Sequence, residues 1–105
     1  MQVKISNAQD LLKNSGNLFK EVFRHGSLVA EIYKPVEIDL QQSHSRDEVY
    51  IIISGKGEFI SDGITCSFEP GDFLFVPAGK EHRFLNFSID FSTWVLFYGP
   101  EGGED

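Results

Sequence analysis

The feature that most restricts the fold is a series of short β-rich runs that follows Gly16 and continues to Tyr98. No stretch of this region repeats apolar residues with the 3.6-residue period of a helix, and turn residues separate the runs at close intervals. The pair Asp62-Gly63, between Ile60 and Ile64, is typical of a two-residue hairpin turn. This pattern predicts an all-β domain with two packed sheets.

The expected strands cover residues 18–24, 28–33, 37–43, 48–54, 58–61, 64–68, 73–76, 82–87 and 92–98. Ahead of them, Asn7 and Asp10 have the spacing of a capping box and Gly16 is a stop signal, which predicts a short N-terminal helical turn. Residues 99–105 are rich in Gly and acidic residues. We therefore expect one domain over residues 1–105, with a barrel over 18–98 and a frayed tail.

Composition narrows the choice of partners and compartment. The formal net charge is −7 and the nine basic residues are scattered, which argues against nucleic-acid binding. The apolar runs are far shorter than the ~20 residues that span a bilayer, so no membrane partner is expected. A lone Cys66 cannot form an internal disulfide, and a reducing cytoplasm fits the chain best.

Side-chain alternation along three of these strands predicts a divalent-metal site. Successive residues of a strand point to opposite faces, so Gln42 and His44 share one face of an extended 37–44 segment. Glu48 begins the next strand and His82 begins a later one. His and Glu are common metal ligands, and the amide of Gln42 is a weaker donor. The residues expected to line a pocket beside the metal, because they share these faces, are Ile38, Leu40, Tyr50, Ile52, Phe84 and Asn86.

The spacing of these residues resembles the two signature motifs of the cupin superfamily. The first motif reads G-x5-H-x-H-x3-4-E-x6-G and the second reads G-x5-P-x-G-x2-H-x3-N. The matching positions of the first motif are Val36, Gln42, His44, Glu48 and Gly55, and those of the second are Gly71, Pro77, Gly79, His82 and Asn86. All five fixed positions of the second motif are kept.

The resemblance implies a cupin jelly-roll barrel, also called a double-stranded β-helix, that is often dimeric and holds one metal on three His and one Glu. This chain departs from that set at Gln42, which stands where the family has its first ligand His. A neutral amide oxygen binds late transition metals less tightly than imidazole does. Mannose-phosphate isomerases of the superfamily look similar at this position. The expected ligands are thus Gln42, His44, Glu48 and His82, with Zn, Fe, Mn or Ni as the metal.

Three classes of function stay open, because a fold does not fix a chemistry. The first is a metal-dependent dioxygenase or a sugar or keto-acid isomerase, with Tyr50 or Glu48 moving the proton. The second is a non-catalytic binder of a small molecule, such as a carbohydrate or an aromatic acid, and this form could be metal-free. The third is a storage or assembly role.

The strand over residues 48–54 also predicts a homodimer. Val49, Ile51 and Ile53 share the face opposite Glu48 and Tyr50, so both faces of this strand carry side chains that avoid water. A second copy of the chain could cover the outer face, and twofold symmetry is the commonest arrangement of soluble oligomers.

Overall fold

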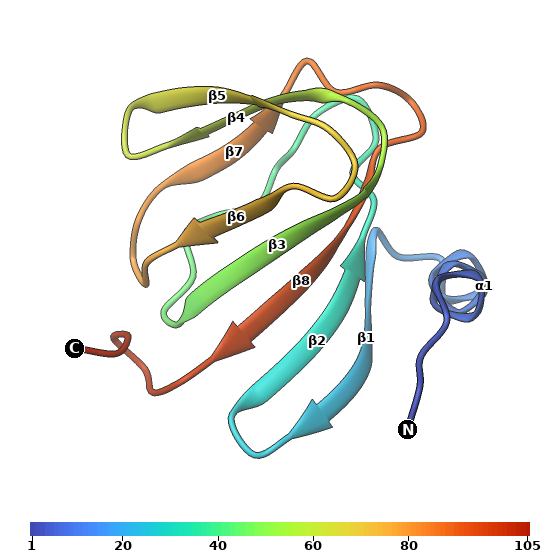
Figure 1. Ribbon diagram of the computed structural model, residues 1–105, viewed down its shortest axis with the longest axis horizontal. Coiled ribbons are helices and arrows are strands. Elements are labelled where there is room, and N and C mark those ends of the chain that lie inside the picture. The colour runs from blue at the N-terminus through green and yellow to red at the C-terminus, as the bar shows by residue number, and fades with distance from the viewer.

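The computed structural model describes residues 1–105 as one helix followed by eight strands (Figure 1). The elements are α1 (Ile5–Ser15), β1 (Phe19–His25), β2 (Leu28–Tyr33), β3 (Asp47–Ser54), β4 (Gly57–Ser61), β5 (Ile64–Phe68), β6 (Phe73–Val76), β7 (His82–Leu85) and β8 (Ser92–Tyr98).

The strands form two antiparallel sheets with the orders β1-β2-β8-β3-β6 and β5-β4-β7. The smaller sheet lies over the β3, β6 and β8 part of the larger one (Figure 1). At the β4–β5 hairpin, Asp62 and Gly63 have φ values of 51° and 80°, as the predicted turn requires. The all-β jelly-roll prediction is confirmed.

The N-terminal helix is longer than the one or two turns that the sequence predicts. It covers 11 residues and is preceded by Lys4, so Asn7 lies inside the helix and does not cap it. Ala8 and Leu12, one turn apart, pack with Ile32 of β2, and this burial extends the helix beyond what local signals favour. Gly16 ends it as predicted, with φ 73°. The helix is too short and too polar to cross a membrane.

The predicted strand over residues 37–43 does not form. Glu37 has a φ of 63°, and the Ile38 N–H donates to the carbonyl of Val36 at 2.6 Å. This tight turn changes which residues face inward. Ile38 and Leu40 are 61% and 78% exposed, so the prediction that they line an inner pocket is wrong, as is the alternation that placed Gln42 beside His44.

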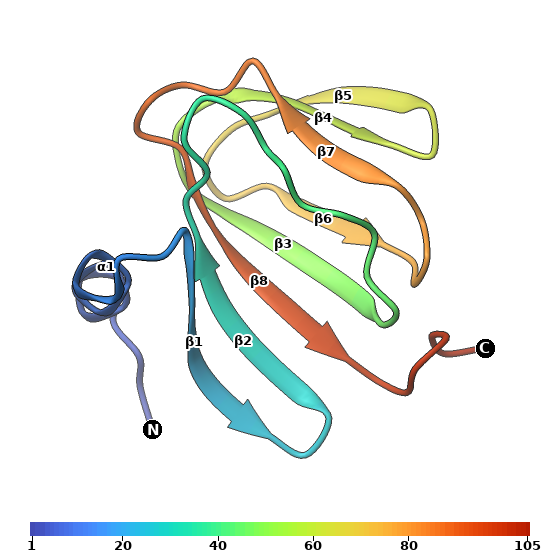
Figure 2. The same ribbon diagram turned by 180° about the vertical axis from the view of Figure 1, so that it is seen from behind.

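A side chain replaces the missing strand at the edge of the smaller sheet. Residues 34–46 run beside β7 (Figure 2), and the buried carboxylate of Asp39 accepts the Phe84 N–H at 2.9 Å. That donor belongs to an edge strand with no backbone partner on this side. Asp39 therefore satisfies a buried backbone group that a ladder would otherwise pair.

Aromatic rings fill the space between the sheets. The ring of Phe84 lies with its centroid 4.7–5.5 Å from those of Phe91, Phe59, Tyr50 and Phe68. These rings belong to a core that also contains Tyr33, Ile52, Val76 and Val95. Of the residues expected to line a pocket, Tyr50, Ile52 and Phe84 are thus core residues. The barrel is packed, and its polar site lies to one side of this core.

Residues 99–105 fold back on the barrel, whereas the sequence predicted a frayed tail. The Gly102 N–H donates to the carbonyl of Ser45 at 2.7 Å, and the Glu104 N–H donates to the carboxylate of Asp47 at 2.8 Å. The second oxygen of that carboxylate accepts the Ala78 N–H. These two N–H groups lower the pKa of Asp47. A buried side chain from elsewhere in the chain therefore anchors a segment that has few apolar residues of its own.

Candidate metal centre

The structure brings His44, Glu48 and His82 together. His44 lies in the loop before β3, Glu48 in β3, and His82 at the start of β7. One ligand atom from each residue lies within 4.8 Å of the other two. His82 Nε2 is 2.9 Å from Glu48 Oε1, and His44 Nε2 is 3.9 Å from Glu48 Oε2.

Backbone pairing places these three side chains. Glu48 pairs with Phe97 on one side and Val76 on the other, so its carboxylate has a fixed position in the middle of the larger sheet. The Gly79 N–H donates to the carbonyl of His44 at 2.7 Å. This bond ties the loop of His44 to the turn that leads into β7, and thus to His82.

A backbone carbonyl decides the protonation of the His82 ring. Nδ1 is 3.1 Å from the carbonyl oxygen of Lys80, which can only accept, so Nδ1 carries the hydrogen and Nε2 of the neutral ring has a lone pair. This lone pair lies close to the Glu48 carboxylate. Neither His82 Nε2 nor Glu48 Oε2 has a hydrogen-bond partner, although both are buried.

This arrangement fits a divalent metal. Two unpartnered acceptor atoms in a buried position are costly unless a cation or a proton lies between them. Ligand bonds of about 2.0–2.2 Å place tetrahedral donor atoms roughly 3.3–3.6 Å apart. The separations within the cluster run from 2.9 Å, between His82 Nε2 and Glu48 Oε1, to no more than 4.8 Å, and they span that range. Two imidazoles and a carboxylate are a donor set for Zn, Fe, Mn or Ni.

A proton on His82 Nε2, in place of a metal, would also satisfy these buried acceptor atoms. Burial opposes a charge on His82, but the protonated ring can donate Nε2–H to Glu48 and is attracted by its carboxylate charge. These two effects outweigh burial, so the pKa of His82 is raised above its usual value. A proton and a metal therefore compete for Nε2.

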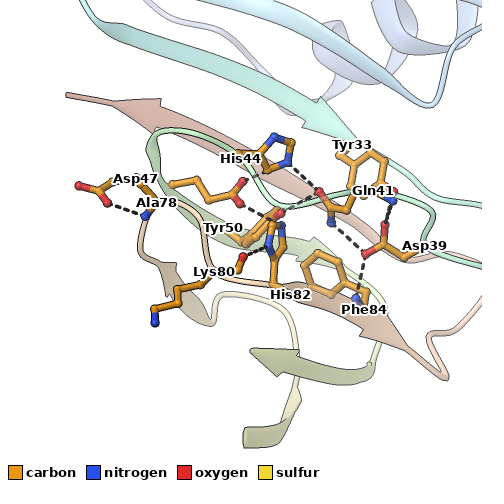
Figure 3. A network of polar contacts seen from close by, with 11 residues as sticks. Tyr33, Asp39, Gln41, His44, Asp47, Tyr50, Ala78, Lys80, His82 and Phe84 are labelled. Atoms are coloured by element: carbon orange, nitrogen blue, oxygen red, sulfur yellow. Dashed lines mark hydrogen bonds and ion pairs between the residues drawn. The ribbon is translucent and has the colours of Figure 1, made fainter. Parts of the chain in front are cut away.

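Gln42 is exposed and makes no side-chain hydrogen bond, whereas its neighbour Gln41 lies against the cluster. Gln41 Oε1 is 3.3 Å from His44 Nε2 and accepts the Tyr50 hydroxyl at 3.0 Å. Its amide nitrogen donates to Asp39 Oδ2 at 2.9 Å. Figure 3 shows Gln41 between His44 and Asp39.

Tyr50 has no exposed surface. Burial, together with the negative charges of Glu48 and Asp39, raises the pKa of Tyr50 well above its usual value. Its hydroxyl therefore stays protonated and acts as a donor, here to Gln41. Asn86, by contrast, is exposed at the end of β7 and donates to Glu58 at 2.7 Å; it does not line the cluster.

A groove of about 920 Å³ reaches this side of the barrel. Gln41, Gln42 and His82 lie on its wall, and Lys80, Arg83 and Asp62 bring charged groups to it. The groove borders the cluster at His82, whose side chain is itself fully buried, whereas the His44 side chain is 35% exposed.

Comparison with known proteins agrees with this geometry. A family profile for the cupin domain matches residues 30–91, which contain all three clustered residues. The chain belongs to the cupin family. A curated relative, the uncharacterized protein SCO3923 of Streptomyces coelicolor, is 36% identical over 63 residues. This cupin matches 60% of that protein's length.

This chain also has the same fold as several solved structures, and the names of those proteins differ. The DMSP lyase DddQ from Ruegeria pomeroyi is 29% identical with a TM-score of 0.63, and the match covers 71% of this cupin but 40% of the lyase. KdgF from a Halomonas species is 21% identical, with coverage of 79% and 80% and a TM-score of 0.67. A Rhizobium leguminosarum protein of unknown function is 20% identical, with coverage of 95% and 97% and a TM-score of 0.70.

Sequence reasoning did not find Asp39 or Gln41. The one available signal was an acidic residue between two large apolar residues, Ile38 and Leu40, in a run expected to be a strand. A strand would send Asp39 to the opposite face from both neighbours. The structure instead buries Asp39 and leaves Ile38 and Leu40 exposed.

Proposed function

We propose that this cupin binds one divalent metal through His44, Glu48 and His82 and uses it to act on a small oxygen-bearing molecule that enters from the groove. The observation that carries the proposal is the buried, unpartnered pair of acceptor atoms, His82 Nε2 and Glu48 Oε2. A fold that gains nothing from a metal would be expected to pair these atoms.

A metal held there would act as a Lewis acid on an oxygen of the substrate. The donors include a single carboxylate, so the site would keep a net positive charge that favours an anionic or enolisable oxygen group. His44 and His82 must be neutral to bind, and the Lys80 carbonyl holds the His82 ring in the correct tautomer.

Tyr50 is the best placed group for proton transfer. Its hydroxyl is protonated, buried and aligned by Gln41 Oε1, so it can donate to an oxygen anion that develops on the substrate. Glu48 is the alternative that the sequence suggested. Its carboxylate faces both imidazoles, and this position suits a ligand better than a base.

Metal analysis of the purified protein tests the proposal. We expect close to one first-row metal per chain, which His44→Ala and His82→Ala each reduce strongly. A chain that binds no Zn, Fe, Mn or Ni after stripping and reloading would end the proposal.

The reaction class follows from turnover assays on the loaded protein. Oxygen uptake with diketones and phenols identifies a dioxygenase, and interconversion of sugars or keto acids identifies an isomerase. Because a relative of 29% identity is a DMSP lyase, the panel includes DMSP. Tyr50→Phe is expected to reduce turnover while leaving the metal bound.

Non-catalytic binding of a carbohydrate or an aromatic acid is the second candidate. The full burial of Tyr50 favours it, because a substrate must displace neighbouring groups to reach the hydroxyl. Tight binding of an unaltered ligand, without turnover across the panel, would select this function. In both cases we place the protein in the cytoplasm.

A further inference from the structure

We propose that Gln41, and not Gln42, supplies the fourth donor atom of the metal site, and that Asp39 is the positioning residue that aims it. This inference rests on the proposed function, because it assumes that His44, Glu48 and His82 hold a metal. Neither Gln41 nor Asp39 occupies one of the motif positions that first indicated the site.

The hydrogen bonds of Asp39 fix the orientation of the Gln41 amide. A carboxylate only accepts, so the group that faces Asp39 Oδ2 at 2.9 Å must be the amide nitrogen of Gln41. The Gln41 backbone N–H also donates to Asp39, at 3.1 Å. The amide oxygen is thus turned towards His44 and Tyr50 (Figure 3).

Asp39 is itself held by groups from two strands. The Tyr33 hydroxyl donates to its Oδ1 at 2.6 Å, and the Phe84 N–H donates to its Oδ2 at 2.9 Å. Asp39 is 1% exposed, and four donors surround its two oxygens. A carboxylate fixed in this way can hold a neighbouring amide in one rotamer, as partners of metal ligands do.

Distance and lone pairs also favour Gln41. Its Oε1 lies 3.3 Å from His44 Nε2, close to the roughly 3.3–3.6 Å that separates tetrahedral donors with bonds of about 2.0–2.2 Å. An amide oxygen has two lone pairs. The Tyr50 hydroxyl uses one of them, and the other faces His44 Nε2, whose hydrogen a bound metal would replace.

Gln41→Ala and Gln42→Ala together test the assignment. The two residues are adjacent in the chain, but Gln41 contacts His44 whereas Gln42 is exposed. We expect Gln41→Ala to weaken Zn²⁺ and Co²⁺ binding by about 10–100-fold, the range found when groups around a metal ligand are removed. Gln42→Ala is expected to bind both ions like the wild type. Affinity is measured by competition with a chromophoric chelator.

The visible absorption of the Co²⁺-loaded protein reports the donor set and would not change if Gln41 only stiffened the loop. We expect it to change in Gln41→Ala and in Asp39→Asn, and to stay the same in Gln42→Ala. If Asp39→Asn does not fold, as judged by circular dichroism, the Gln41 and Gln42 pair still decides the assignment.

Two outcomes would overturn the inference and leave the metal site standing: a Gln41→Ala protein with wild-type affinity and spectrum, or a Gln42→Ala protein with the larger change. A wild-type protein that binds neither ion would instead reject the proposed function, and this inference with it.

Discussion

The substitution Glu48→Gln should stabilise the metal-free protein at alkaline pH while it abolishes metal binding. In the wild type, the neutral His82 ring presents a lone pair at Nε2 to a carboxylate oxygen 2.9 Å away. A glutamine of the same shape can place its NH₂ group there and donate to Nε2. Two close acceptors then become a donor and an acceptor.

The expected gain follows from the burial of these atoms. A buried polar group without a partner costs about 1–3 kcal/mol, and the change gives His82 Nε2 a partner. For a domain of about 100 residues, each kcal/mol corresponds to roughly 4 °C in Tm. We expect metal-free Glu48→Gln to melt about 4–12 °C above the wild type.

Whether Glu48→Gln is more or less stable than the wild type depends on pH. The raised pKa of His82 means that the Glu48–His82 ion pair contributes fully below the unfolded-state value of about 6.5, and this contribution is lost as pH rises through the higher folded-state pKa. Glu48→Gln has no such ion pair. Its advantage is therefore expected near pH 9, and the wild type should be the more stable protein near pH 5.

The assay is thermal unfolding by circular dichroism in chelator between pH 5 and 9, repeated with Zn²⁺. Glu69→Gln is the control, since it removes the same charge from an exposed position. Zn²⁺ at 100 times its Kd should stabilise the wild type by about 2.7 kcal/mol and leave Glu48→Gln unchanged. A lower Tm for Glu48→Gln at pH 9, or stabilisation of it by Zn²⁺, would refute the reasoning.

Three further predictions concern the fold and its assembly. Gly55→Ala should cost about 1–3 kcal/mol more in urea unfolding than Gly63→Ala, because both glycines have positive φ but only a Cβ at Gly55 would meet the Phe91 backbone, at 2.5 Å; equal costs would contradict this. Tyr33→Phe removes one donor to Asp39 and should cost about 1.5–3 kcal/mol; an unchanged urea midpoint would show that Asp39 does not need this bond. The homodimer stays a prediction, supported by the exposed Phe73 and Phe75 on the edge strand β6; light scattering should find a dimer that Phe73→Glu converts to monomer, and a monomeric wild type would reject it.

The predictions that succeeded depend on local patterns. The Asp62-Gly63 turn needs two residues with positive φ, and few other pairs supply them at low cost. Gly16 ended α1 for the same reason. The positions of Glu48 and His82 followed from the spacing of the two motifs along the chain.

The failures share one cause, which is that long-range contacts decided the local structure. Ile38 and Leu40 suit a strand, but Glu37 turns the chain. Asp39 is drawn inward by Tyr33, 6 residues away, and by Phe84, 45 residues away. The same holds for residues 99–105, which Asp47 and Ser45 anchor. Propensity cannot anticipate such bonds, because they depend on which groups the rest of the fold leaves unpaired.

The sequence by itself therefore determined the all-β class, the cupin resemblance and the grouping of His44, Glu48 and His82, because turn chemistry and motif spacing are local properties. Only the tertiary structure decided that Gln41 faces the cluster, that Gln42 is exposed, and that Asp39 is buried at the edge of β7. Glu37, with its positive φ, turns the chain so that Asp39 faces inward while Ile38 and Leu40 face outward. The contact with Phe84, 45 residues away, helps to hold Asp39 in this position, and residue propensities carry no information about such a contact.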